Sequence, residues 1–261
     1  MSLNLNIPSL QTLLSSVRRA VDDYDMIAEG DRIAVGVSGG KDSLALLCVL
    51  SALKKFYPIR FEIVPVHLRM GFPGEDSEPI QELCEELGLK LVEVPTDIYE
   101  VVFGIRQEKS PCSLCANLRR GILYSTAKAA GCRKIALGHH FDDAVETLMM
   151  NLFVEGRFGC FAPVTYLSRM EVTMIRPMLY VKESDIRRYI RLAGIRPVPK
   201  LCPSDGFTKR EETKQALAEL ERKDPGVKKR LFGALERSGV DGYAVHPRGR
   251  KKYTEENKEQ T

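Results

Sequence analysis

Residues 35–43 read Val35-Gly36-Val37-Ser38-Gly39-Gly40-Lys41-Asp42-Ser43, between a run of β-branched residues and a helical pattern. Glycines in such a turn let the backbone approach a ligand closely, and the unpaired N–H groups that open the following helix favour an anion. Ser38 and Ser43 add hydroxyl donors, and Lys41 adds a positive charge. The segment therefore predicts a phosphate-binding loop, in which Asp42 holds a magnesium ion or orients the backbone.

The spacing within this loop excludes two other nucleotide-binding patterns. Only three residues separate Gly36 from Gly40, and Asp42 stands where a Walker A loop has Ser or Thr after its lysine. The G-x-G-x-x-G fingerprint of dinucleotide-binding folds is also missing from the sequence. A plain glycine-rich turn between a strand and a helix is the alternative interpretation.

Outward from the loop, short β-branched runs alternate with helical patterns. This alternation predicts an α/β fold with a mostly parallel five-stranded sheet and helices on both faces. The expected strands are residues 32–37, 61–66, 89–94, 134–137 and 172–175. The expected helices are residues 8–24, 41–56, 77–87, 113–130, 142–153 and 183–192.

The chain divides into four expected segments. Residues 1–30 form an N-terminal helical segment, and residues 31–204 form the nucleotide-binding domain. Residues 205–246 form a charged helical extension, which is broken at Asp224-Pro225-Gly226. Residues 247–261 form a basic tail that we expect to be disordered, or ordered only with a partner.

The composition is that of a soluble globular protein. Of the 261 residues, 44% are hydrophobic and 28% are charged, which argues against a disordered chain. No apolar run approaches the roughly 18 residues of a membrane-spanning helix, and the start MSLNLNIPSL lacks the pattern of a secretory signal. We therefore expect a cytoplasmic protein that works away from membranes.

Two basic segments stand out on a chain whose net charge is only +4. Residues 105–135 carry a net charge of +6 and residues 169–200 carry +5, whereas residues 62–100 carry −8. One positive face for a polyanion would explain the two basic segments, although ordinary solvated helix faces are the alternative. The candidates for phosphate contacts are Arg119, Arg120, Arg187, Arg188 and Arg191.

Seven cysteines, an odd number, argue against a disulfide framework and favour metal or redox chemistry. Cys112 and Cys115 form a C-x-x-C at the start of an expected helix, and Cys202 lies far downstream. The pair alone is compatible with half of a zinc site, with a redox dithiol or with part of an iron–sulfur site. The other four cysteines are interpreted as packing residues: Cys48, Cys84, Cys132 and Cys160.

A histidine–aspartate segment, Gly138-His139-His140-Phe141-Asp142-Asp143, follows the end of an expected strand, where α/β sheets place their ligands. Either histidine could contact phosphate or act as an acid, and either aspartate could hold magnesium or position a substrate base. The alternative is a helix cap, in which Asp142 caps the helix and Glu146 supports its first turn.

The loop Ser38-Gly39-Gly40-Lys41-Asp42-Ser43 resembles the SGGxDS loop of the PP-loop ATP pyrophosphatases, whose fold is that of the adenine nucleotide α hydrolases. The resemblance implies that the loop binds the pyrophosphate of ATP together with Mg²⁺. It also implies that AMP is transferred to a carbonyl oxygen of the substrate, which turns that oxygen into a good leaving group.

Further segments resemble the tRNA 2-thiocytidine synthetases. They are Pro111-Cys112-Ser113-Leu114-Cys115, Leu118–Tyr124, Lys134–His140, Asp142-Asp143 with Glu146-Thr147-Leu148, and Ile175-Arg176-Pro177. The resemblance implies that Cys112, Cys115 and Cys202 hold a 4Fe–4S cluster in residues 31–204. It implies that one iron stays open and carries sulfide for transfer. The chain departs from the family at residues 66–71 and 199–204.

The resemblance implies a function: ATP- and iron–sulfur-dependent tRNA thiolation that makes 2-thiocytidine. Its implied catalytic residues are the three cysteines, His139, Asp142 and Asp143, with ATP held by Ser38–Ser43, Gly138 and His140. The implied partners are tRNA and a sulfur donor such as a cysteine desulfurase. A homodimer is a possible assembly of the chain. The alternatives are a PP-loop enzyme for another base or sulfur route, a lysidine-type ligase that handles no sulfur, and a non-catalytic ATP- and RNA-binding module with a structural metal.

Overall fold

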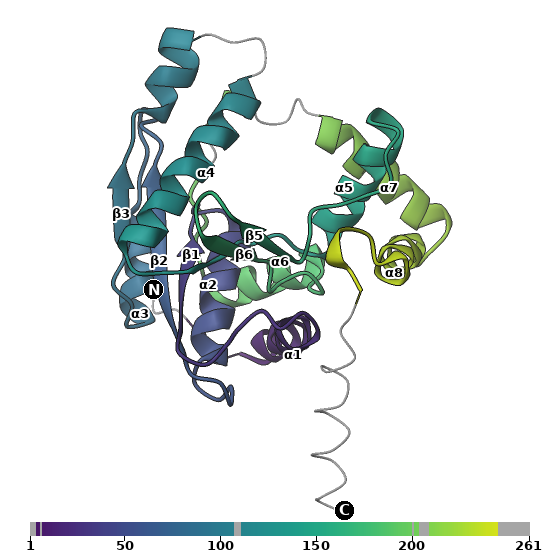
Figure 1. Ribbon diagram of the computed structural model, residues 1–261, viewed down its shortest axis with the longest axis horizontal. Helices are drawn as coiled ribbons and strands as arrows, with labels where there is room; N and C mark the ends of the chain where they lie inside the picture. Colours follow the sequence, from purple (N-terminus) through teal and green to yellow (C-terminus); the bar gives the residue numbers. More distant parts are fainter. Residues whose placement is uncertain (1–3, 6, 107–110, 200, 204–208, 245–261) are drawn as a thin grey trace, which may run out of the picture.

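The computed structural model describes residues 4–5, 7–106, 111–199, 201–203 and 209–244. In these residues a six-stranded sheet has the order β3-β2-β1-β4-β6-β5, and every neighbouring pair is parallel except β5 with β6 (Figure 1). The strands are β1 (Asp31–Gly36), β2 (Phe61–Arg69), β3 (Val92–Pro95), β4 (Lys134–Ala136), β5 (Val164–Leu167) and β6 (Val172–Ile175). The expected mostly parallel α/β sheet is confirmed.

The expected count of five strands is wrong, because β5 is missing from it. This strand has four residues, lies at the edge of the sheet and pairs only with β6, with which it forms an antiparallel hairpin. Its residues are exposed or half-buried, so the sequence shows no clean alternation of apolar and polar positions. The hairpin closes through Glu171, whose φ is +55°.

Helices cover both faces of the sheet, as the sequence predicts. They are α1 (Pro8–Asp23), α2 (Lys41–Leu53), α3 (Glu78–Glu86), α4 (Pro111–Ala129), α5 (Phe141–Val154), α6 (Glu183–Ala193), α7 (Lys209–Lys223) and α8 (Val227–Ser238), with a π-helix η1 (Glu100–Arg106) and a 3-10 turn η2 (Val240–Gly242). Successive residues of β1 face opposite sides: Ile33 and Val35 join the larger core with α1 and α2, whereas Ala34 packs with Tyr124 of α4.

The terminal helices belong to the same packed body as the sheet. Helix α1 packs against α2 and α6, and both α7 and α8 pack against α5. Leu13 of α1, Leu217 of α7 and Leu235 of α8 are buried in one core cluster. The predicted basic tail, with Arg248, Arg250, Lys251 and Lys252, lies outside the described residues. No helix in the described part of the chain is long and apolar enough to cross a membrane.

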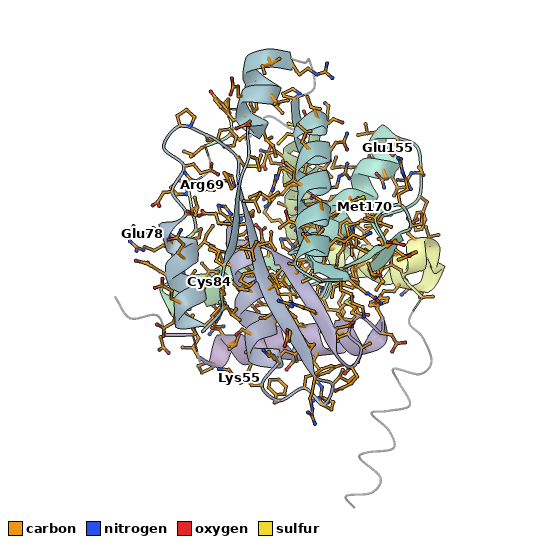
Figure 2. All side chains as sticks on the ribbon, turned by 60° about the vertical axis from the view of Figure 1, so that its left-hand side comes forward. Lys55, Arg69, Glu78, Cys84, Glu155 and Met170 are labelled. Carbon is orange, nitrogen blue, oxygen red and sulfur yellow. The ribbon has the colours of Figure 1, made fainter. Side chains whose placement is uncertain are left out.

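The order of the strands creates a crevice at one end of the sheet. From β1 the chain passes to β2 on one side, whereas β4 lies on the other side of β1. A ligand site is expected where the connections diverge in this way, at the carboxyl ends of the strands. Arg69, which ends β2, marks that end of the molecule, and Lys55, which follows α2, lies at the opposite end (Figure 2).

Candidate active site

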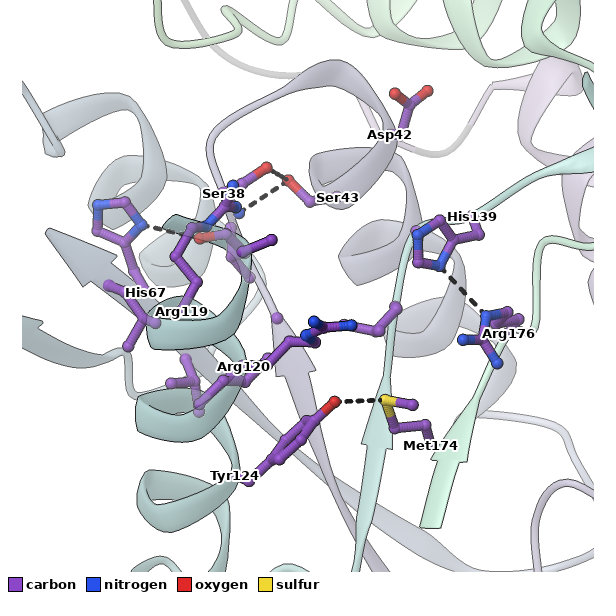
Figure 3. Close-up of a pocket in the computed structure, with 18 of the residues that line it drawn as sticks. Ser38, Asp42, Ser43, His67, Arg119, Arg120, Tyr124, His139, Met174 and Arg176 are labelled. Carbon is purple, nitrogen blue, oxygen red and sulfur yellow. Dashed lines mark hydrogen bonds between the residues drawn. The ribbon is translucent and has the colours of Figure 1, made fainter. Parts of the chain in front are cut away.

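A cavity of about 670 Å³ opens at the carboxyl ends of β1, β2 and β4. Its walls come from the segment after β1, the ends of β2 and β4, one side of α4 and the first turn of α7 (Figure 3). The cavity therefore lies where the strand order predicts a ligand. Its volume is within the range of small-molecule and cofactor sites in proteins.

Residues 37–43, named here the phosphate loop, are held in shape mainly by Ser43. Its Oγ accepts a hydrogen bond from the Ser38 N–H at 3.1 Å and donates one to the Gly40 carbonyl at 2.9 Å. The two serine hydroxyls are 3.2 Å apart and both residues line the cavity. The structure thus brings Ser38 and Ser43 together at the start of α2, where the sequence places them.

Gly39 lies on the outer side of the same loop, against the chain that leads to Cys202. Its φ is +80°, and a Cβ there would lie 2.7 Å from Val198 Cγ2. The Gly39 carbonyl accepts a hydrogen bond from the Val198 N–H at 2.9 Å. A glycine is therefore needed at this position both for the backbone conformation and for the close approach of Val198.

Lys41 and Asp42 have different surroundings. The Lys41 ammonium lies 3.0 Å from Asp42 Oδ2 and 3.0 Å from Glu183 Oε1, so it is turned toward carboxylates of α2 and α6. Burial lowers the pKa of Lys41, but these two carboxylates outweigh that effect and raise it. Asp42 lines the cavity, and its Oδ1 is buried without a hydrogen-bond partner, 3.6 Å from His140 Nε2. A carboxylate oxygen without a hydrogen bond fits a bound cation such as Mg²⁺.

His139 lies between the phosphate loop and Arg176 (Figure 3). Its Nδ1 accepts a hydrogen bond from Arg176 Nε at 3.3 Å, and its ring lies 5.0 Å from the Phe161 ring. Burial, together with the positive charge of Arg176, lowers the pKa of His139 from 6.5 to about 4. Gly138 also lines the cavity, and a Cβ there would lie 3.1 Å from the Asp42 backbone, so β4 and α2 are in close contact.

The cap of α5 differs from the prediction. His140, not Asp142, is the capping residue: its Nδ1 accepts from the Asp143 N–H at 3.4 Å, and Asp143 Oδ2 accepts from the His140 N–H at 2.9 Å. Asp142 is the second residue of the helix. Its Oδ2 accepts from the Glu183 N–H, and its Oδ1 pairs with Lys228 of α8, both at 2.8 Å. Burial opposes these contacts, yet they hold the pKa of Asp142 below its ordinary value.

No motif in the sequence points to Arg210, which reaches the cavity from the first turn of α7. Its guanidinium lies 3.1 Å from Asp143 Oδ1 and donates to the Thr147 hydroxyl at 3.1 Å. Both oxygens of Asp143 are therefore occupied by protein groups. Beside this pair Glu146 is 3% exposed, and burial, reinforced by the charge of Asp143, raises its pKa to about 7.

The three cysteines of the C-x-x-C and of the downstream segment lie near one another. Cys112 is exposed, and Cys115 and Cys202 are half-buried. Burial raises the pKa of the Cys115 thiol, Arg119 opposes that effect, and the thiols of Cys202 and Cys112 are close enough to add to the rise. Among the described residues no three His, Cys, Asp or Glu side chains already form a metal-binding group. Residues 107–110 and 204–208, which adjoin these cysteines, lie outside the description.

The remaining cysteines confirm the packing interpretation, since Cys48, Cys84, Cys132 and Cys160 are all buried.

The basic candidates separate into two groups. Arg119 and Arg120 of α4 line the cavity, whereas Arg187 of α6 is exposed and pairs with Glu183 at 2.8 Å. At residues 66–71, where the sequence departs from the family, Leu68 and Met70 line the cavity.

The comparisons with known proteins agree with this geometry. A family model described as a PP-loop domain matches residues 10–199. A tRNA-cytidine(32) 2-sulfurtransferase of Geobacter sulfurreducens is 42% identical over 227 residues, which cover 85% of this chain and 87% of that protein. The enzyme of the same name from Vibrio vulnificus is 41% identical over 84% of this chain and 71% of its own length.

Among solved structures, a U34-tRNA thiolase from Methanococcus maripaludis, determined with its 4Fe–4S cluster, has the same fold. The TM-score is 0.68 at 24% sequence identity, over 85% of this chain and 77% of that chain.

Proposed function

Because the chain belongs to the PP-loop family and, within it, to the tRNA-cytidine 2-sulfurtransferases, we propose that it uses ATP to make 2-thiocytidine in tRNA. The chain is an enzyme of the tRNA sulfurtransferase kind. The observation that carries the finer proposal is the cavity itself. Its floor is the phosphate loop, and Arg119 in its wall interacts with Cys115 of the C-x-x-C.

ATP binds in this proposal with its pyrophosphate on the phosphate loop. The free N–H groups at the start of α2 and the hydroxyls of Ser38 and Ser43 face the phosphates. Asp42 would supply a carboxylate oxygen without a hydrogen bond to Mg²⁺, and the ion would neutralise phosphate charge. Arg119 and Arg120 add positive charge to the opposite wall, where they neutralise phosphate charge or hold the tRNA backbone.

The reaction has two steps. The oxygen on C2 of the cytosine attacks the α-phosphorus of ATP, the bond to the β-phosphate breaks, and pyrophosphate leaves. Sulfide then attacks C2, and the bond from C2 to the adenylylated oxygen breaks, so that AMP leaves with that oxygen. Adenylylation is needed because an oxygen bonded only to carbon is a poor leaving group.

The donor set fits an iron–sulfur cluster. Cys112, Cys115 and Cys202 come from two segments, and the thiol of Cys115 is close enough to the other two to interact with them. Thiolates are the protein ligands of such clusters. A 4Fe–4S cluster on these three thiolates would supply the sulfide of the second step. Arg119 favours the thiolate form of Cys115, and the side of α4 that carries Arg119 faces the nucleotide.

Asp142 and Asp143 act here as anchors. Each has both oxygens occupied by partners within the protein. Asp142 positions α5 against α6 and α8, and Asp143 positions it against α7. A direct catalytic role for either residue stays a prediction, as do the cysteine desulfurase, the homodimer and the four-segment division of the chain. One observation favours a second candidate, thiolation of another base, because the segment that departs from the family lines the cavity at Leu68 and Met70.

Tests of the proposal begin with ATP turnover on anaerobically purified protein. AMP and pyrophosphate release should depend on added tRNA, and thiolated tRNA should appear only with a sulfide source. Cys112→Ala should keep ATP binding but lose thiolation together with the visible absorption and about four irons per chain. Cys132→Ala, which changes a buried packing cysteine, should keep both. A colourless wild-type protein with one zinc would contradict the cluster.

A further inference from the structure

Arg176 is a buried cation among neutral partners. The residue follows β6 and is 6% exposed. Its guanidinium donates to the Ala162 carbonyl, to the Thr165 hydroxyl at 3.2 Å and to the His139 ring, and it lies 4.9 Å from the centre of the Phe161 ring. Burial of a charged side chain is costly unless its contacts repay the cost. The buried positive charge of Arg176 must therefore act on the side chains around it.

The contact with His139 fixes the position of a proton. A guanidinium can only donate hydrogen bonds, so the His139 Nδ1 that faces Arg176 Nε must carry the lone pair. The ring is neutral at neutral pH, because burial and the charge of Arg176 lower its pKa to about 4. A neutral imidazole without a proton on Nδ1 has it on Nε2.

The ring is also fixed in orientation. Phe161 lies against His139 with 5.0 Å between ring centres, and it lies against the guanidinium as well, so one aromatic side chain supports both partners. In Figure 3 the second nitrogen of the His139 ring is on the side away from Arg176, toward Ser43. His139 lines the cavity together with Ser38 and Ser43 of the phosphate loop.

We propose that Arg176 is a positioning residue that holds His139 with its proton on Nε2, so that His139 donates a hydrogen bond to a phosphate oxygen of ATP that gains negative charge as pyrophosphate leaves. The proposal rests on the proposed function for the identity of the nucleotide. It assigns His139 as a hydrogen-bond donor, because a nitrogen that carries the proton cannot accept another. A general base at this place would need the lone pair on the edge that faces the cavity.

The tautomer can be read directly by NMR on protein labelled with ¹⁵N in its four histidines. Two-bond ¹H–¹⁵N correlations distinguish Nδ1–H, Nε2–H and charged rings. His139 should be the neutral Nε2–H form at pH 7. His67 is the internal control with the opposite form, because its Nδ1 must donate to the Val37 carbonyl at 2.8 Å. A His139 signal of the Nδ1–H form, or of a charged ring, would overturn the proposal.

Arg176→Met should release the constraint. We expect the Nδ1–H form of His139 to appear and its pKa to rise, while the His67 signal stays unchanged. Persistence of the pure Nε2–H form in a folded variant would show that Arg176 does not set the tautomer. If this variant does not fold, the wild-type spectrum still decides the proton's position.

Two substitutions of His139 test the donor function. His139→Phe keeps a ring against Phe161 but has no donor, and we expect kcat for pyrophosphate release to fall about 100-fold with little change in KM for ATP. His139→Gln keeps an N–H donor and should recover at least a tenth of the wild-type kcat. Full activity of the Phe variant, or equal loss in both, would overturn the donor role. Absence of tRNA thiolation by the wild type would instead count against the proposed function, since the tautomer is measured without tRNA.

Discussion

The hydroxyl of Ser43 joins three parts of the phosphate loop. It accepts from the Ser38 N–H, lies beside the Ser38 hydroxyl and donates to the Gly40 carbonyl. Ser43→Ala removes all three contacts and should cost about 1 kcal/mol of stability. Calorimetric titration should show ATP affinity at least 10-fold weaker, because the loop loses its shape.

Ser51→Ala is the matched control for that experiment. Ser51 is also buried on α2, but it borders a separate small cavity near Tyr189. Its substitution should leave ATP affinity unchanged. Equal loss of affinity in both variants would mean that α2 as a whole, and not the Ser43 hydroxyl, determines binding.

Glu146 gives the protein a pH-dependent stability. Burial beside Asp143 raises its pKa from 4.5 to about 7, so the folded protein holds the proton more tightly than the unfolded chain does. This contribution is full below about pH 4.5 and is lost as pH rises toward 7. Glu146→Gln, which stays neutral, should therefore become more stable than wild type across this window, by about 3 kcal/mol at most. Urea unfolding at pH 5 and pH 8 measures the difference, and a constant difference would contradict the raised pKa.

Single residues also show where sequence reasoning stops. Residues 138–143 carry a clear signal of a ligand site, and general preferences predict Asp142 as the cap of α5, because aspartate is a stronger capping residue than histidine. His140 caps instead, because Glu183 and Lys228, both distant in sequence, occupy the Asp142 carboxylate. Only the tertiary structure reveals those partners.

At the scale of elements, the contact between the phosphate loop and the chain before Cys202 can be tested at Gly39. Gly39→Ala puts a Cβ 2.7 Å from Val198 Cγ2 and 2.8 Å from Val198 Cβ, in a backbone with φ +80°. The loop or the Val198 segment must move, so ATP affinity should fall at least 10-fold. In addition, the positive φ should lower the folding stability by about 1–2 kcal/mol.

Gly88→Ala separates the clash from the backbone cost. Its φ is +66°, and a Cβ there would meet nothing within 4 Å. This control should show a similar backbone cost in thermal unfolding and normal ATP binding. Normal ATP binding by Gly39→Ala as well would contradict a tight contact at Val198.

The docking of α8 depends on a buried ion pair. Lys228 lies 2.8 Å from Asp142, and the side chains are 19% and 12% exposed. Lys228→Met leaves the carboxylate without its cation and should cost about 3 kcal/mol at pH 7. The exposed Lys229 is the control, and Lys229→Met should change stability by less than about 0.5 kcal/mol. Because the pKa of Asp142 is lowered, the loss from Lys228→Met should shrink as pH falls below 3.8.

The elements themselves were largely predictable because they combine strong local signals. The helix at α2 follows the glycine-rich loop, and the break at Asp224-Pro225-Gly226 separates α7 from α8. β5 is not predictable from the sequence, because this short edge strand owes its pairing to β6 and carries little periodicity of its own. Arg210 is not predictable either, because the charged sequence of α7 gives no sign of which arginine faces a cavity.

At the scale of the whole molecule, the site is assembled from both halves of the chain. The phosphate loop follows β1, and the histidines follow β4. Helix α4 forms one wall of the cavity, and Arg210 of α7 lines it as well. The sequence could single out the phosphate loop and the C-x-x-C of Cys112 and Cys115, because each forms a compact local pattern. It could not predict that Asp143 and Asp142 bind the C-terminal helices, because those contacts join residues 67 and 86 positions apart.

The central claim is that the cavity activates a tRNA cytidine for sulfur insertion. Its most direct test is mass spectrometry of nucleosides from tRNA incubated anaerobically with the iron-loaded protein, ATP, Mg²⁺ and sulfide. We expect a cytidine in which sulfur replaces one oxygen, absent without ATP and absent with Cys112→Ala. Unmodified cytidine after incubation with protein that holds its cluster and binds ATP would contradict it, and a thiolated uridine would assign the enzyme to another base.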